Sequence, residues 1–325
     1  MRKTFRFLVE DRPGEAWRER FVASWPAIKR WYLKDGLDAR PSLAACDRAF
    51  DRHMPELKPM WRHLCALAGD GDLASRVLSL WYTPNVFDGC SVAVTDEGGP
   101  ILVRNYDFDP NLTGSEIIHT NWSGRRVIGL NEASSGLLDG MNDAGLAVCL
   151  TFGGRPICGE GFSVVLVLRY VLETCRTAAE AADTVLRLRT ALPQNVVVLD
   201  ASGEHFTALM GPDRDTRIWK TSVTTNHPEA VEWPEHAANV RTVERFEYLC
   251  DRLGSPAIEE QFFAPPLYST GYTQGFGTVY TVSYRPDRGE AVFAWPGKKM
   301  RHSFERFSPT EVTVDFVDGE PARVA

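Results

Sequence analysis

Apolar residues follow a helical period in the first quarter of the chain. Between residues 15 and 82 they recur at spacings of three and four, which is typical of amphipathic helices. The clearest stripe consists of Trp17, Phe21, Trp25, Ile28, Trp31 and Tyr32. Further helical segments are predicted over about 42–68, with Pro55 and Pro59 bounding or kinking it, and over 72–82. We therefore expect a helical N-terminal segment that ends where Pro84 and Asn85 break the pattern.

From about residue 90 the period changes to two, which is typical of strands. Alternating segments flank turn-forming residues such as those at 96–99 and 142–145, and this arrangement predicts four β-hairpins. The paired segments are 90–95 with 101–105, 137–141 with 146–152, 196–199 with 205–210, and 279–284 with 291–295. Helices are predicted over about 162–175, 178–191 and 238–253. Hairpins on either side of a central helix pair indicate an α+β fold, in which antiparallel sheets pack against helices.

Composition excludes several classes of protein. The chain has 325 residues, 44% of them hydrophobic, which suits a soluble globular protein with a sizeable core. Acidic residues outnumber basic ones, 43 to 36, and no basic stripe occurs, so we expect no nucleic-acid partner. The longest apolar stretch, 162–168, is far shorter than the roughly 20 residues of a membrane helix, so we expect no membrane partner either.

Cysteine usage favours a reducing compartment. Seven cysteines are too few for a disulfide scaffold of this length, and the number is odd. No apolar run of signal-peptide length follows the charged N-terminus. The sequence therefore predicts a cytoplasmic protein with free thiols.

Common cofactor and metal motifs do not occur. The sequence contains no G-x-S-x-G elbow, no phosphate-binding loop and no H-E-x-x-H pair, and Gly159-x-Gly161 lacks the third glycine of a dinucleotide motif. His53, His63 and Cys65 do not have the spacing of a zinc site. We expect neither a metal nor a cofactor.

The main chemical candidate is Cys90, which follows Asp88 and Gly89 and begins the first hairpin. If residues 95 and 100 close that hairpin, Cys90 lies opposite Asn105, to within one or two residues of register. Arg104 and Asp107 then flank the thiol, and a neighbouring cation favours the nucleophilic thiolate. The carboxylate would orient the arginine or bind an ammonium group. The same residues also fit a buried cysteine, a surface ion pair and an ordinary Asp-Gly turn, so local sequence leaves both interpretations open.

Several motifs occur together in the order of a known family. They are Asp88-Gly89-Cys90, Arg104-Asn105-x-Asp107, 142–147 (Asn-Asp-Ala-Gly-Leu-Ala), 225–228 (Thr-Asn-His-Pro), Val-x-Arg-Phe around Arg245, and 278–282 (Thr-Val-Tyr-Thr-Val). In this arrangement the chain resembles the choloylglycine hydrolase and penicillin acyltransferase group of N-terminal-nucleophile hydrolases over about 85–297. Residues 1–89 resemble the N-terminal extension of the acyl-coenzyme A:6-aminopenicillanic acid acyltransferase branch.

The resemblance implies a fold and a division of the chain. The fold would be a four-layer αββα sandwich of antiparallel sheets between helices. Cleavage between Gly89 and Cys90 would separate a helical segment, 1–89, as an alpha chain from a catalytic domain, 90–325, as a beta chain. We expect the two parts to remain together as a heterodimer. Whether this heterodimer oligomerises further stays open.

The resemblance also implies roles for individual residues. Cys90 would attack the carbonyl of Gly89, and the freed amino group would then serve as general base while the thiolate attacks a substrate amide. Arg104 would lie beside the sulfur, Asp107 would hold the new amino group, and Arg245 would support the network. Asn226 would donate to the oxyanion. Bile salt hydrolases carry a second oxyanion asparagine where this chain has Thr151, so Thr151 or a backbone N–H remains as the second donor.

Two of these assignments have structural alternatives. Asn226 also fits an Asx-turn before Pro228, and Arg245 also fits a solvated helix face, where Arg241 competes for its role.

The function that we expect is a self-processing cysteine amidase or acyltransferase. Its substrate would be a small linear amide or acyl donor, with acyl-coenzyme A among the candidate substrates, and the acyl group would pass through a Cys90 thioester. One alternative is a cysteine hydrolase whose chain stays intact and whose base is a residue such as His227. Another is a binding protein that has the fold without turnover.

Overall fold

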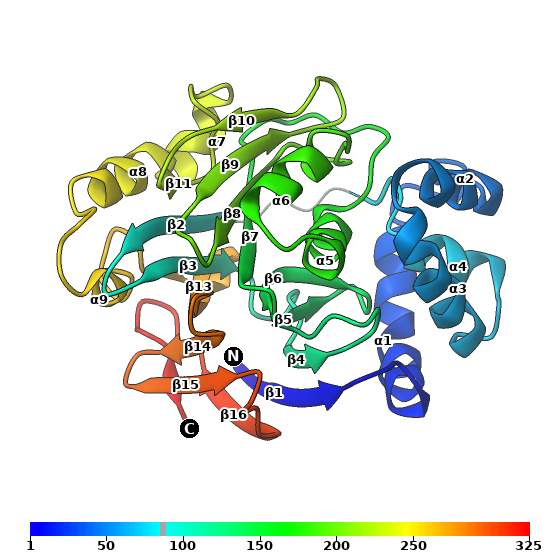
Figure 1. The fold of residues 1–325 in the computed structure, drawn as a ribbon, viewed down its shortest axis with the longest axis horizontal. Helices are drawn as coiled ribbons and strands as arrows, with labels where there is room; N and C mark the ends of the chain where they lie inside the picture. The colour runs from blue at the N-terminus through cyan, green and yellow to red at the C-terminus, as the bar shows by residue number, and fades with distance from the viewer. Residues whose placement is uncertain (85–88) are drawn as a thin grey trace.

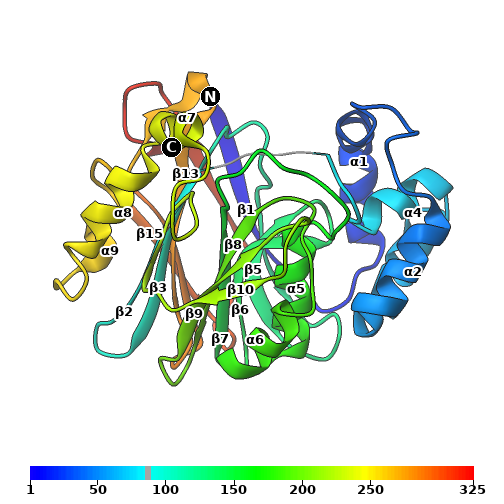
Figure 2. The ribbon, with the colours of Figure 1, turned by 90° about the horizontal axis from the view of Figure 1, so that it is seen from above.

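The computed structural model describes residues 1–84 and 89–325, and it forms four layers (Figures 1 and 2). Two β-sheets pack face to face. Helices α5 (Val164–Thr174) and α6 (Ala178–Val185) cover one outer face, and α8 (Thr242–Cys250) and α9 (Ile258–Gln261) cover the other. The predicted α+β sandwich is confirmed. Asp88 of the predicted cleavage motif lies outside the described residues.

The larger sheet has ten strands within the described residues, in the order β10-β9-β8-β7-β6-β5-β4-β1-β16-β17. Neighbouring strands are antiparallel except for β1 and β4, which are parallel. The strands are β1 (Arg2–Glu10), β4 (Glu116–Thr120), β5 (Val127–Glu132), β6 (Gly136–Asn142), β7 (Leu146–Phe152), β8 (Gln194–Asp200), β9 (His205–Met210), β10 (Arg217–Trp219), β16 (Thr310–Asp315) and β17 (Arg323–Val324).

The smaller sheet is antiparallel and has the order β11-β2-β3-β13-β14-β15, with β12 paired to β13. Its strands are β2 (Gly89–Asp96), β3 (Pro100–Phe108), β11 (Val223–Thr224), β12 (Thr270–Gly271), β13 (Phe276–Arg285), β14 (Glu290–Trp295) and β15 (Lys298–Ser303). A short 3₁₀ helix, Tyr272–Gln274, precedes β13. β11 is the edge strand beside β2, and the two strands run antiparallel. The chain that follows β11 therefore lies next to the start of β2.

The N-terminal segment is helical beyond its first strand and packs at the α5 side of the sandwich (Figure 2). Its helices are α1 (Glu15–Tyr32), α2 (Leu43–His53), a 3₁₀ turn (Pro55–Leu57), α3 (Lys58–Leu67) and α4 (Asp72–Leu78). Trp17 and Phe21 of the predicted stripe are buried and their rings stack with centroids 5.1 Å apart. Removing such aromatic surface from water is the main force that holds α1 in place.

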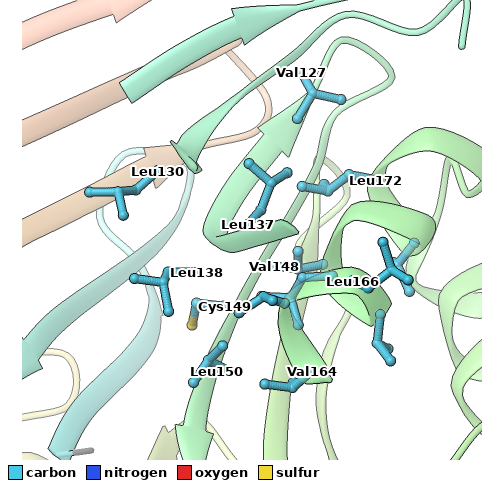
Figure 3. Close-up of a cluster of buried hydrophobic side chains, with 14 of the residues drawn as sticks. Val127, Leu130, Leu137, Leu138, Val148, Cys149, Leu150, Val164, Leu166 and Leu172 are labelled. Atoms are coloured by element: carbon cyan, nitrogen blue, oxygen red, sulfur yellow. The ribbon is translucent and has the colours of Figure 1, made fainter. Parts of the chain in front are cut away.

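Apolar side chains fill the space between the larger sheet and its helices. Figure 3 shows side chains of β5, β6 and β7, such as Leu137 and Val148, packed with Leu166 and Leu172 of α5. α5 is buried along nearly its whole length, in agreement with the apolar run 164–168, which follows Phe162 and Ser163. That run is therefore part of the core. Within the described residues, no helix has the length and apolar character needed to cross a membrane.

The four predicted hairpins are present, as β2–β3, β6–β7, β8–β9 and β13–β14. Three features differ from prediction. Residues 2–10 form β1, which was not predicted and lies inside the larger sheet between β4 and β16. The helix predicted over 238–253 is divided into α7 (Pro234–Asn239) and α8, because Arg241 between them has a left-handed φ of 51°. The helix predicted over 178–191 ends early, at Val185.

Candidate active site

Cys90 lies at the start of β2 and is completely buried. It pairs with Tyr106 of β3 rather than with Asn105, so the predicted register was one residue out. The correction matters because a shift of one residue moves a side chain to the other face of a sheet. Val92 pairs with Arg104, and Cys90, Val92, Arg104 and Tyr106 therefore share the face that meets the larger sheet.

Three polar atoms of Cys90 are each bound by a different predicted residue. Arg104 Nη2 donates to Cys90 Sγ at 3.2 Å. The backbone N–H of Cys90 donates to Asn226 Oδ1 at 3.0 Å. Arg245 Nη1 donates to the carbonyl oxygen of Cys90 at 2.6 Å. Residues far apart in the sequence thus converge on one cysteine.

Arg104 is fully buried and connects the sulfur to a carboxylate of the opposite sheet. Its Nη1 donates to Asp139 Oδ2 at 2.5 Å and to Tyr280 Oη at 3.2 Å. Burial opposes its charge, but attraction to Cys90, Tyr280 and Asp139 outweighs that cost and raises the pKa of Arg104 well above its usual value. Arg104 therefore provides a fixed positive charge beside the sulfur, which favours a thiolate.

Asp107 is buried beside the predicted cleavage site. It pairs with Gly89 in the β2–β3 register, and its Oδ1 accepts from Thr278 Oγ1 at 2.7 Å. Its Oδ2 lies 3.7 Å from Arg245 Nη1 and has no hydrogen-bond donor in the described part of the chain. Burial raises the pKa of Asp107, while Arg245 and the Thr278 hydrogen bond oppose that shift. A buried acceptor without a donor is costly, and it suits an incoming ammonium group.

Gly89 allows close packing at this site. A Cβ atom at this position would overlap the ring of Phe276 and would lie 3.2 Å from the Cβ of Asp107. The absence of a side chain at Gly89 thus lets the Phe276 ring and Asp107 approach the backbone next to the Gly89–Cys90 bond. This packing is a structural reason for the Gly-Cys pair.

Asn226 follows β11, and the register of β11 with β2 places it beside Cys90. Its Oδ1 accepts from both the Cys90 N–H and Arg245 Nη2, the latter at 2.6 Å, which leaves the amide nitrogen as its donor end. The loop is held by residues that were not predicted. Thr242 Oγ1 accepts from Asn226 N at 2.7 Å, and Asn195 Nδ2 donates to the carbonyls of Thr225 and His227, each at 3.1 Å.

Thr151 supports this loop. Its hydroxyl donates to the carbonyl of Thr225 at 2.5 Å, and its oxygen accepts from Asn195 Nδ2 at 3.1 Å. Because its only hydroxyl proton is used for Thr225, this geometry does not support Thr151 as an oxyanion donor. We correct that expectation and assign Thr151 to the positioning of the 225–227 loop.

The two candidate arginines of the 241–245 region have different surroundings. Arg245 is 1% exposed and also donates to Ser91 Oγ at 2.7 Å. Burial lowers its pKa, whereas Asp107 and Cys90 act in the opposite direction. Arg241 is exposed and forms a surface pair with Glu244. Arg245 is therefore the arginine at the site, and the solvated-face alternative does not hold for it.

His227, the alternative base, is bound to hydroxyl groups. Its Nδ1 lies 2.8 Å from Thr242 Oγ1 and 3.2 Å from Thr225 Oγ1. Burial and the charge of Arg245 lower its pKa to about 4. At neutral pH the ring is a weak base whose Nδ1 already interacts with hydroxyls, which argues against the unprocessed mechanism.

An apolar cavity of about 630 Å³ lies between the N-terminal segment and the two sheets. Its lining includes Tyr106, whose ring lies under the Arg104 guanidinium at 4.8 Å and which pairs with Cys90 in the sheet. Its lining is Ala27, Ile28, Trp31, Lys34, Val77, Leu80, Thr83, Pro84, Tyr106, Phe108, Asn111, Leu112, Glu132, Ala133, Leu138, Leu150, Ser163, Val164, Val165, Ala191, Leu192 and Gln194. Residues between 27 and 84 of the N-terminal segment thus supply one wall of the cavity. In residues 1–84 and 89–325 no group of three His, Cys, Asp or Glu side chains is placed to hold a metal ion.

Comparison with known families decides the group to which this site belongs. The model of the acyl-coenzyme A:6-aminopenicillanic acid acyl-transferase family matches residues 94–300, more than half of the chain. The chain belongs to this family. The matched range begins shortly after Cys90 and includes Arg104, Asp107, Asn226 and Arg245. The predicted resemblance to this family is confirmed, and with it the prediction of an enzyme of the penicillin acyltransferase type.

Solved structures similar to this acyl-transferase family member are distant. Penicillin V acylase from Agrobacterium tumefaciens is 16% identical, with a TM-score of 0.47, over 70% of this chain and 91% of that chain. The Caenorhabditis elegans N-acylethanolamine-hydrolyzing acid amidase ortholog is 16% identical, with a TM-score of 0.46, over 68% of this chain and 98% of that chain. A mutant of conjugated bile acid hydrolase from Clostridium perfringens is 12% identical, with a TM-score of 0.44, over 73% of this chain and 96% of that chain. No curated protein matches the chain.

Proposed function

We propose that the chain is a self-processing cysteine amidase or acyltransferase that passes the acyl group of a small linear amide through a thioester on Cys90. The observation that carries this proposal is the binding of three atoms of Cys90 by Arg104, Asn226 and Arg245. A buried structural cysteine does not need a cation at its sulfur. A nucleophile does, because the thiolate is the reactive form.

Self-processing begins with the thiol of Cys90 and the carbonyl carbon of Gly89. A C–S bond forms, the Gly89–Cys90 C–N bond breaks, and the thiol proton passes to the new amine. Water then hydrolyses the thioester, which releases the Gly89 carboxylate and restores the thiol. Asp107 Oδ2 lies 3.7 Å from Arg245 Nη1 and has no hydrogen-bond donor in the described residues, so it would accept from the new α-ammonium group, which remains close to Asn226 Oδ1.

Turnover uses the same sulfur with the new amine as base. The α-amino group has a reference pKa of about 7.7–8.0, which suits proton transfer near neutral pH. The amine takes the thiol proton, the thiolate attacks the substrate carbonyl, and the protonated amine donates to the leaving nitrogen. Asn226 donates to the oxyanion through its amide nitrogen. Water or a second amine then attacks the thioester and releases the acyl group.

The cavity supports an apolar acyl group. Ile28, Trp31 and Leu112 give it apolar walls that would favour a hydrocarbon chain over a charged one. The polar side chains of Lys34, Asn111, Glu132 and Gln194 also lie in the lining. We propose amides of apolar carboxylic acids as the substrate class, with acyl-coenzyme A as a candidate acyl donor. All seven cysteines are free, which supports a reducing compartment such as the cytoplasm.

Intact mass analysis and amide turnover of the wild type and Cys90→Ala test the proposal. The wild type should give fragments of ~10 and ~26 kDa, by scaling the mass with length. It should also hydrolyse simple acyl amides. Cys90→Ala should remain one chain and lose turnover, because one sulfur performs both attacks. Cys149→Ala is the matched control, since Cys149 is equally buried in the same core and burial keeps it as a thiol by raising its pKa far above the usual value.

The remaining outcomes identify the alternatives. Turnover by an uncleaved wild type would indicate the intact-chain hydrolase. Thiol labelling of Cys90 without cleavage or turnover would indicate a binding protein. Residual turnover above a few per cent in Cys90→Ala would contradict the assignment of the nucleophile.

A further inference from the structure

We propose that Asp139, Tyr280 and Tyr284 form a positioning network that sets how strongly Arg104 acts on the sulfur of Cys90. The inference rests on the proposed function, because it concerns the activation of the same nucleophile. The three residues act through Arg104, from β6 of the larger sheet and β13 of the smaller one.

The network is a set of short hydrogen bonds among buried side chains. Asp139 Oδ2 accepts from Arg104 Nη1 and from Tyr280 Oη, each at 2.5 Å. Asp139 Oδ1 accepts from Tyr284 Oη at 2.6 Å. Arg104, Asp139, Tyr280 and Tyr284 are all fully or almost fully buried. Buried ion pairs persist only where their remaining atoms are satisfied, and the two hydroxyls satisfy the carboxylate.

The two tyrosines control the charge that Asp139 presents to Arg104. A carboxylate bonded only to Arg104 would cancel most of the positive field at the sulfur. Each hydroxyl that donates to Asp139 disperses its negative charge, so more of the Arg104 charge acts on Cys90. Burial, together with the charge of Asp139, raises the pKa of Tyr280 and Tyr284 well above the usual value, so both hydroxyls keep their protons and remain donors.

Other charged or titratable groups near the site do not replace this function. Cys149 of β7 pairs with Asp139 and stays a neutral thiol through burial. Tyr106 of β3 contributes the face of its ring to Arg104. Asp107 and Arg245 interact with each other, and Arg245 contacts the carbonyl of Cys90. Among these groups, the Asp139 network is the one hydrogen-bonded to the guanidinium that contacts the sulfur.

Tyr284→Phe is the direct test, because it removes one hydroxyl that donates to Asp139 Oδ1 and keeps the ring. The measurement is the pH dependence of iodoacetamide alkylation at Cys90, followed by mass spectrometry of the peptide that carries it. The readout is the pH at which the alkylation rate of Cys90 reaches half its maximum. Burial slows iodoacetamide by the same factor at every pH, so it does not move this midpoint. We expect the midpoint to rise by about 0.5–1 pH unit, which lowers the rate below the midpoint by roughly three- to tenfold. Tyr280→Phe should shift it in the same direction and serves as the second variant.

Tyr170→Phe is the matched control. Tyr170 is a buried tyrosine of α5 whose hydroxyl donates to Glu56 at 2.6 Å, so its loss has a similar structural cost away from the site. It should lower the melting temperature without moving the midpoint. A wild-type midpoint in both Tyr280→Phe and Tyr284→Phe would overturn the network while leaving the proposed function intact. A wild-type Cys90 that is uncleaved and titrates like exposed Cys250 would instead contradict the proposed function.

Discussion

Two buried arginines bind different atoms of Cys90, and this difference determines what each can do. Arg104 presents one nitrogen to the sulfur and another to Asp139. Arg245 instead binds the carbonyl of Cys90, Ser91 Oγ and Asn226 Oδ1. The planar guanidinium allows such multiple contacts in fixed directions, which a lysine ammonium would not reproduce. Arg104 therefore acts on the sulfur of the proposed nucleophile, whereas Arg245 aligns the residues around it.

Asp107→Asn should reduce turnover by about 100-fold with little loss of stability. The amide cannot hold an α-ammonium group, so the base is misplaced, and general base catalysis typically contributes this much. Folding should be almost unaffected, because the substitution removes a buried charge whose Oδ2 lacks a donor in the described residues. Measurements of kcat/KM and of the melting temperature on the same preparation check this prediction.

Asp200→Asn is the control for Asp107→Asn. Asp200 is also a buried carboxylate, but both of its oxygens accept hydrogen bonds, from Ala178 N and from Ser202. Its substitution should cost stability and leave kcat/KM of the folded enzyme unchanged. Equal losses of melting temperature and activity in Asp107→Asn would show that Asp107 is structural.

His227 should make the protein sensitive to mild acid. Its folded pKa of about 4 is below the unfolded value of 6.5, because burial and Arg245 disfavour the charged ring. The unfolded chain therefore binds a proton first, and stability present above pH 6.5 is lost as the pH falls toward 4. When the pH falls from 7.5 to 5, protonation linked to this group alone should lower the free energy of unfolding by about 2 kcal/mol. Thermal unfolding at both pH values should show a smaller acid-induced loss of melting temperature for His227→Asn than for the wild type. An identical acid loss in that variant would assign the sensitivity to other groups.

The hairpin predicted around 96–99 placed Arg104 and Asp107 near Cys90, whereas Asn226 and Arg245 were expected from the resemblance of their motifs to the family. Asp139 could not be predicted in the same way. It is a single polar residue inside an apolar strand, and its partners Arg104 and Tyr284 are 35 and 145 positions away. Only tertiary packing shows that a polar residue in such a strand is satisfied by the opposite sheet.

At the level of elements, sequence predicted the hairpins better than their register. The turn at 96–99 fixed which strands pair, but Cys90 lies opposite Tyr106 because Asp96 and Pro100 close the hairpin. β1 was missed for a different reason. Only Phe5 and Phe7 are buried in it, and its partners are β4 and β16, far along the chain. A weak period of two without a local turn gives no signal that a strand joins a sheet.

Helix α1 should determine which acyl groups the enzyme accepts. Ile28 lines the cavity, so Ile28→Trp should reduce its volume and move the preference to shorter acyl chains. We expect kcat/KM for the longest accepted amide to fall by at least about tenfold, since each methylene in an apolar pocket has an effect of that order. Val22→Trp on the same helix is the control, because Val22 is exposed to solvent. An unchanged chain-length profile in Ile28→Trp would exclude this cavity as the acyl site.

At the scale of the whole molecule, the segment before the proposed cleavage site is an integral part of the fold. β1 is paired on both sides within the larger sheet. Phe5, Phe7, Trp17 and Phe21 bury their side chains in the main core. Burial of a large apolar side chain contributes roughly 1.5–3 kcal/mol, so these four alone give a gross gain on the order of 10 kcal/mol. Cutting the chain at Gly89 would leave every one of these contacts in place.

The two fragments should therefore remain together after cleavage. In size-exclusion chromatography under native conditions, the ~10 and ~26 kDa fragments, sizes estimated from chain length, should elute as one species that retains activity. Phe7→Asp should weaken this association, since it places a charge in the core, whereas Val9→Asp on the exposed face of the same strand should not. A lone large fragment with full activity would show that the N-terminal segment is a disposable propeptide, and the α1 wall of the cavity would then have no place in the mature enzyme.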